Sequence, residues 1–130
     1  MPVSEQISSL SQLAELHHVK PHGALYNQAH KDPELAAAVV EGISRVLPKT
    51  LIYTLPAGCL AAAAQNAGHT AIGEGFLDRT YQSDGSLTPR SEPNAILTDT
   101  QSIVSQALKL AASPQHQTLC VHGDSEHAIS

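Results

Sequence analysis

The chain has 130 residues, a mass of 13.7 kDa and a formal net charge of -5. A chain of this length buries roughly two thirds of its unfolded surface, so we expect one domain over residues 1–130 with its own core. Aromatic residues make up 3% and charged residues 15% of the chain, which excludes the basic, aromatic-lined surfaces that bind nucleic acids. The longest uncharged apolar stretch, residues 57–64, is far shorter than the roughly 20 residues that cross a bilayer.

The N-terminal string MPVSEQISSL has neither the basic start nor the apolar core of a secretory signal, so we expect a cytoplasmic protein. In a reducing compartment, Cys59 and Cys120 are expected to be buried thiols and not a disulfide.

The hydrophobic pattern alternates between helical and strand periodicity along the chain. Asp32, Pro33 and Glu34 form a helix start signal, and Pro48 ends that helix. The predicted elements are, in order, a helix over 4–16, a strand over 18–20, a helix over 35–47, a strand over 51–55, a helix over 59–67, a strand over 70–76, a helix over 95–112 and a strand over 118–122.

Alternating helices and strands predict an α/β fold with a parallel sheet. A full (β/α) barrel uses about 31 residues per unit, so 130 residues correspond to about four units of a partial (β/α) barrel. Residues 77–95 are polar and rich in glycine and proline, which predicts a long loop of the kind that usually carries function.

Ligands of parallel α/β folds bind at the carboxyl ends of the strands, and the polar residues of this chain gather there. The first strand ends in Lys20, with His22, Tyr26 and Asn27 after it. The third contains Glu74, with Asp78, Arg79, Tyr81 and Arg90 after it, and the last ends in His122, with Asp124 after it. The glycines on either side of Glu74 deny it packing neighbours and allow backbone to approach a ligand.

Simpler readings exist for several of these residues. His22 fits a plain turn, Asp78, Arg79 and Arg90 fit an internal ion pair that holds the loop shut, and His122-Gly123-Asp124 is a short pattern. The other histidines are expected on the surface or at helix ends: His17, His18, His30, His69, His116 and His127.

Three long strings give a resemblance: VKPHGALYN (19–27), GEGFLDRTYQSDGSLTPRSEPNAIL (73–97) and CVHGDSEHAI (120–129). They resemble the family of the 5-oxoprolinase A subunit, also called the lactam-utilisation or LamB/YcsF family, in order and spacing. The likeness covers the later half of the family's chain. The family's earlier Asp-x-Asn-x-Asp-x-Gly-Glu, Gly-Phe-His-Ala-Gly-Asp and Ala-His-Pro segments do not occur in this sequence.

The resemblance implies a barrel related to polysaccharide deacetylases and glycoside hydrolases. It also implies an ATP-dependent enzyme that, with its B and C subunits, hydrolyses the lactam 5-oxoproline to L-glutamate. The sequence contains no Gly-x-x-x-x-Gly-Lys-Ser/Thr string that would locate the ATP.

For such a reaction we expect Lys20, Arg79 and Arg90 to offset phosphate or carboxylate charge, with Asn27, Asp78 and Tyr81 as further binding residues. Glu74 or Asp124 would act as general base, and His22 or His122 as general acid or orienting partner.

Two other functions are left open by the residues. The first is a divalent-metal deacetylase-like hydrolase of carbohydrates or amides, with His22, His122 and Asp124 as ligands. The second is an inactive piece, or one completed by a partner or a second copy of itself, because a half-barrel has two open sheet edges.

Overall fold

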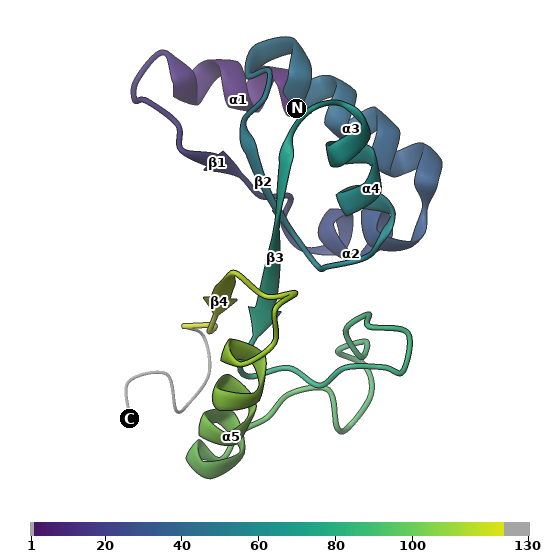
Figure 1. The fold of residues 1–130 in the computed structure, drawn as a ribbon, viewed down its shortest axis with the longest axis vertical. Coiled ribbons are helices and arrows are strands. Elements are labelled where there is room, and N and C mark those ends of the chain that lie inside the picture. Colours follow the sequence, from purple (N-terminus) through teal and green to yellow (C-terminus); the bar gives the residue numbers. More distant parts are fainter. Residues whose placement is uncertain (1, 124–130) are drawn as a thin grey trace. The chain divides into compact units, whose positions relative to one another are not determined.

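The computed structural model describes residues 2–123. Its elements alternate between helices and short strands (Figure 1). They are α1 (Val3–Ser11), β1 (His18–Val19), α2 (Ala24–Lys31), α3 (Pro33–Val46), β2 (Leu51–Thr54), α4 (Cys59–Asn66), β3 (Thr70–Phe76), α5 (Thr100–Ala111) and β4 (Thr118–Cys120). Among these residues, no helix is long and apolar enough to cross a membrane.

The strands are parallel and follow the order β1-β2-β3-β4. His18 pairs with Leu51 at the start of the β1–β2 ladder, and Glu74 pairs with Thr118 at the start of the β3–β4 ladder. Parallel strands joined by helices confirm the predicted α/β class, a half-barrel of four strands. The chain divides into two compact units, Met1–Ile72 and Gly73–Ser130, and the boundary lies inside β3.

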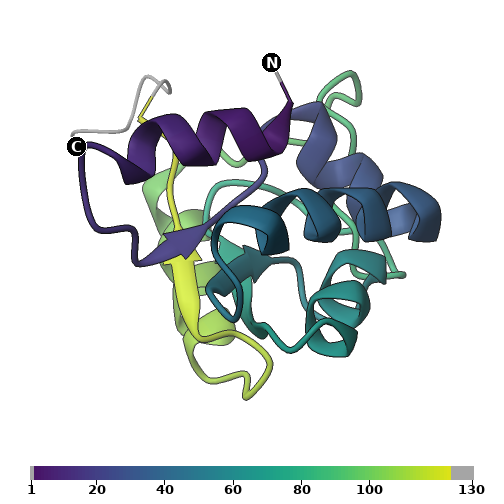
Figure 2. The same ribbon diagram turned by 90° about the horizontal axis from the view of Figure 1, so that it is seen from above.

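The first unit holds an aliphatic core between its helices and β2. Ile43 of α3, Ile52 of β2 and Leu60 of α4 are fully buried there. Helix α3 contacts both α1 and α4, and Figure 2 shows the three lying side by side. Burial of large aliphatic side chains stabilises the unit without aromatic residues at its centre.

The start of α3 confirms the signal in the sequence. Asp32 is the N-cap, and its Oδ1 accepts hydrogen bonds from the backbone N–H groups of Glu34 and Leu35 at 3.0 and 3.1 Å. Pro33 occupies the first turn, where no intrahelical donor is lost.

Two boundaries differ from the prediction by five residues, and one helix was not predicted. Helix α1 ends at Ser11 instead of Leu16, and α5 starts at Thr100 instead of Ala95, because Asp99 caps it by accepting from the Ser102 N–H at 2.9 Å. Helix α2 was not predicted at all. It follows Gly23, whose φ of 62° turns the chain, and no side chain caps its start.

His69 is a further correction, because it is buried and not on the surface. Its Nδ1 lies 2.9 Å from the Thr50 carbonyl and its Nε2 lies 2.7 Å from Ser44 Oγ. The ring therefore links α3 to the turn before β2. His127 lies outside the described residues.

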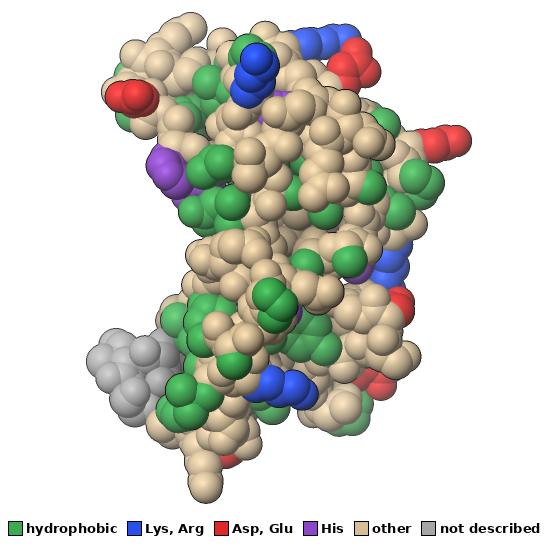
Figure 3. Space-filling view, in the orientation of Figure 1, with side chains coloured by type: hydrophobic (Ala, Val, Ile, Leu, Met, Phe, Trp, Pro, Cys, Tyr) green, Lys and Arg blue, Asp and Glu red, His purple; other side chains and the backbone are tan. Residues whose placement is uncertain are grey.

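The second unit contains the end of β3, the predicted loop, α5 and β4. The loop is present, but it is held by its own backbone: Thr80 and Thr88 N–H donate to the Ala95 and Thr80 carbonyls at 2.9 and 3.0 Å. Isolated antiparallel bridges join Arg79 to Ile96 and Tyr81 to Leu87. Within the described residues neither Cys59 nor Cys120 forms a disulfide, and both are half-buried. Charged side chains are few and scattered on the face drawn in Figure 3.

Candidate functional site

Strand β3 presents different residues on its two faces, because side chains alternate along a strand. Glu74 and Phe76 share one face and are 3% and 4% exposed. On the other face, a Cβ added to Gly73 would overlap the Gln115 carbonyl, and one added to Gly75 would lie 3.1 Å from Leu119. The close approach that the glycines permit is therefore used by the chain's own backbone and side chains.

Asp78 and His122 form a pair at the ends of the neighbouring strands β3 and β4. Nδ1 of His122 lies 2.9 Å from Oδ1 and 3.2 Å from Oδ2 of Asp78. The backbone N–H of His122 also donates to Oδ2 at 2.9 Å. The Asp78 side chain is 4% exposed, so this buried carboxylate has His122 as its partner on both oxygens.

The pair fixes the tautomer and orientation of the imidazole. A carboxylate only accepts hydrogen bonds, so Nδ1 of His122 carries a proton, and in a neutral imidazole the lone pair is then on Nε2. The His122 ring also stacks on Phe76, with centroids 5.7 Å apart and an interplanar angle of 13°. Because the His122 side chain is 25% exposed, this arrangement can exchange a proton with a bound molecule.

Tyr81 reaches back from the loop to the end of β3. Its hydroxyl oxygen accepts a hydrogen bond from the Phe76 N–H at 2.8 Å. Burial raises the pKa of Tyr81, the Phe76 N–H opposes that shift, and the negative charge of Glu74 adds to it. The hydroxyl therefore stays protonated and can donate to a ligand.

Arg79 is buried, and its Nη2 donates to the Thr88 carbonyl at 2.7 Å. Within residues 2–123 its Nε has no hydrogen-bond partner and its guanidinium forms no ion pair with Asp78. Burial lowers the pKa of Arg79 and the nearby charge of Arg90 lowers it further, while Asp78 and Tyr81 oppose this. The alternative of an Asp78–Arg79 ion pair is wrong for the described chain, since the loop is closed by the Arg79–Thr88 hydrogen bond.

The first unit carries the other predicted site residues. Lys20 Nζ lies 5.8 Å from the ring centroid of the buried Tyr26, a cation–π distance. Asn27 Nδ2 donates to the Gly23 carbonyl at 3.3 Å, so this amide supports the start of α2. His22 is exposed.

Two of the proposed metal ligands, His22 and His122, belong to different units, and Asp124 lies outside the described residues. Among residues 2–123, no three His, Cys, Asp or Glu side chains come together in a way that could hold a metal ion.

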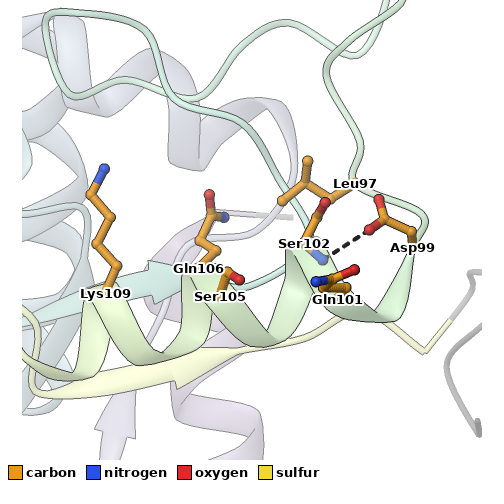
Figure 4. A pocket seen from close by; sticks show the side chains of 7 residues that line it. All are labelled: Leu97, Asp99, Gln101, Ser102, Ser105, Gln106 and Lys109. Atoms are coloured by element: carbon orange, nitrogen blue, oxygen red, sulfur yellow. Dashed lines mark hydrogen bonds between the residues drawn. The ribbon is translucent and has the colours of Figure 1, made fainter.

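Sequence reasoning missed Gln106, whose amide contacts three backbone carbonyls at the end of β3. The signal was a polar residue on the core-facing stripe of α5, between Ile103 and Leu110. Gln106 also lines a pocket of about 510 Å³ along α5 (Figure 4). The pocket is lined by Leu97, Asp99, Gln101, Ser102, Ser105, Gln106 and Lys109. None of the residues predicted from the strand ends lies among them.

The chain is similar in sequence to curated proteins that share one name. The chain is 42% identical to the A subunit of 5-oxoprolinase from Limosilactobacillus fermentum, over 98% of this chain and 57% of that protein. It is 43% identical to the corresponding protein of Tolumonas auensis, over 88% of this chain and 51% of that protein. The chain thus spans about half the length of the curated relatives it matches.

The fold has a counterpart among solved structures. A lactam utilization protein from Thermus thermophilus superimposes with a TM-score of 0.81 at 33% identity, over 92% of this chain and 56% of that one. The family model described as LamB/YcsF matches residues 2–130, so this half-barrel, with its Asp78–His122 pair, belongs to the LamB/YcsF family.

Proposed function

We propose that this chain supplies part of the active site of an ATP-dependent 5-oxoprolinase, as the A subunit of that enzyme, and that the reaction is hydrolysis of 5-oxoproline to L-glutamate. The names of the relatives support this activity. The observation that carries the proposal is the Asp78–His122 pair, which leaves Nε2 of an oriented imidazole available for proton transfer.

Opening a lactam needs water to attack the carbonyl carbon and a proton for the departing ring nitrogen. His122 first takes up a proton at Nε2 from solvent, which makes it an imidazolium that Asp78 stabilises, and it then delivers this proton to the ring nitrogen. Asp78 thereby acts through His122 as a positioning residue, and Glu74 or Asp124 takes the proton of the attacking water. The buried Glu74 is close enough to Tyr81 to affect its pKa, so both groups fit one site.

The substrate and product are carboxylates, and they require positive charge that is not already neutralised. Arg90 lies close enough to Arg79 to lower the pKa of Arg79. The Asp78 carboxylate is hydrogen-bonded to His122. Nε of Arg79 is a buried donor without a partner among residues 2–123. We assign this arginine pair to a carboxylate or phosphate oxygen, with Tyr81 as a further binding residue.

ATP would supply the activation of the lactam oxygen, which makes the carbonyl carbon a better electrophile for water. Phosphate oxygens would be held by the same arginine pair. We also propose that the reaction takes place in the cytoplasm and that the B and C subunits of 5-oxoprolinase assemble with this chain.

The proposal is tested by adding the purified chain to the B and C subunits with ATP and 5-oxoproline and measuring glutamate. We expect glutamate formation to depend on this chain. His122→Gln should lower the rate by about 100-fold to 10,000-fold, the usual contribution of a general acid–base residue. His17→Gln, at an exposed histidine of the first unit, is the matched control and should keep the rate. A chain that adds nothing to the activity of the B and C subunits, or a fully active His122→Gln variant, would contradict the proposal.

A further inference from the structure

Gln106 lies in the middle of α5, and its amide reaches the end of β3. Nε2 lies 2.6 Å from the Phe76 carbonyl oxygen, 2.6 Å from that of Arg79 and 3.2 Å from that of Leu77. In Figure 4 its side chain extends from the same side of α5 as that of Lys109. One side-chain amide thus serves three carbonyl groups of a four-residue segment.

These carbonyls lie on both sides of Asp78 in the sequence. Leu77 N–H still donates to the Cys120 carbonyl of β4 at 2.9 Å, and the Asp78 carbonyl accepts from Leu97 N–H at 2.9 Å. The carbonyls of Phe76, Leu77 and Arg79 have the Gln106 amide as their donor instead. A carbonyl that is shielded from water and has no donor costs free energy of folding. We therefore expect loss of the Gln106 amide to disturb the backbone of this segment before other parts of the chain.

We propose that Gln106 is a positioning residue for the Asp78–His122 pair. It holds the backbone on both sides of Asp78, so that both carboxylate oxygens stay within hydrogen-bonding distance of His122. This role rests on the proposed function of the pair. It predicts that removal of the Gln106 amide changes the tautomer of the His122 imidazole, although these three hydrogen bonds of Gln106 go to the backbone around Asp78 and not to His122.

Chemistry explains why a glutamine suits this position. Its NH₂ group offers two protons to carbonyl oxygens, whereas a glutamate at 106 would bring only acceptor oxygens against them. An asparagine is one methylene shorter than the span from α5 to the three carbonyls. Methionine keeps the length and the helix propensity and removes only the donors.

The test is nitrogen NMR of the His122 imidazole in the full 130-residue chain. We expect the unchanged protein to show the Nδ1–H tautomer, and Gln106→Ala to lose this preference and to exchange the Nδ1 proton faster. Gln101→Ala is the matched control, since it makes the same truncation on an exposed part of the same helix and should leave the His122 signals unchanged. Should the alanine variant not fold, Gln106→Met provides the same comparison with the packing retained.

Asp78→Asn shows what loss of the pair looks like, which separates the two proposals. If Asp78→Asn alters the tautomer and a folded Gln106 variant does not, the positioning role of Gln106 is wrong and the pair stands. If neither variant alters it, the pair itself is wrong, and the proposed function loses its main support.

Discussion

Asp78 holds His122 by both its ring and its backbone: Oδ1 lies 2.9 Å from Nδ1, and Oδ2 accepts from the backbone N–H of the same histidine at 2.9 Å. Each residue lies two positions past the end of its strand, β3 for Asp78 and β4 for His122. The pair thus joins two segments that the β3–β4 ladder already brings together.

Replacing Asp78 by asparagine should destabilise the chain, because an amide nitrogen would face a donor in a buried place. We expect a loss of about 1–3 kcal/mol in the free energy of unfolding, measured by urea denaturation. Asp32→Asn is the control, since asparagine caps a helix about as well as aspartate. Equal stability of Asp78→Asn and the unchanged protein would contradict the buried pair.

Tyr81 gives the chain an alkaline sensitivity. Burial holds the pKa of Tyr81 above its ordinary value of 10.0, so the unfolded chain loses this phenolic proton at lower pH than the folded chain. The free energy of unfolding should therefore fall as pH rises above about 10, and Tyr81→Phe should weaken that dependence. Tyr53→Phe, which keeps a ring stacked on His18, is the control for loss of a tyrosine hydroxyl elsewhere in the chain.

Asp32 at the start of α3 tests the helix cap. Asp32→Ala removes the acceptor for two N–H groups and should cost about 0.5–2 kcal/mol of unfolding free energy, whereas Asp32→Asn should cost only a few tenths, about 0.3 kcal/mol. Urea denaturation of the two variants distinguishes them. The cap has no energetic role if both variants are equally stable.

Gly58 and His30 test the packing between α4 and α2. A Cβ at Gly58 would overlap Nδ1 of His30, so Gly58→Ala should destabilise by about 1–3 kcal/mol through overpacking. Most of this cost should vanish when Gly58→Ala is made in a His30→Ala background. Additive effects in this double-mutant cycle would mean that the two residues do not meet.

The expectation that residues 1–130 form a single domain stays a prediction, and we propose that the two compact units unfold together. Their boundary lies between Ile72 and Gly73, inside β3, so neither unit has the whole strand by itself. The ring signals of His69 in the first unit and His122 in the second should vanish at the same urea concentration. Two separate midpoints would show two domains.

Much of the fold was predictable because its signals are local. Alternating periodicity identifies each strand, and Asp32-Pro33-Glu34 locates the start of α3. Helix α2 was missed because its sequence is polar and its start uncapped. Packing of Tyr26, Ala29 and His30 stabilises it, and such tertiary contacts leave little trace in local sequence.

The candidate site was predictable as a set of strand ends but not as a set of contacts. Asp78 was predicted just after its strand and His122 at the end of its own, although β4 already ends at Cys120. Their pairing across 44 positions depends on the register of β3 and β4. The Arg79–Thr88 hydrogen bond depends on the path of the loop. Turn residues such as Gly85 allow that path but do not determine it, so the sequence did not predict this contact.

The two glycines of β3 also guard against misfolding. If β3 shifted by one residue along β4, the Glu74 side chain would meet the Gln115 carbonyl and a glycine would take the place of Glu74 on the other face. Such a chain would carry a buried carboxylate against a carbonyl oxygen and would have lost an acidic group from its candidate site. Gly73 and Gly75 therefore make the slipped pairing unfavourable, so correct folding and the correct placement of Glu74 are selected together.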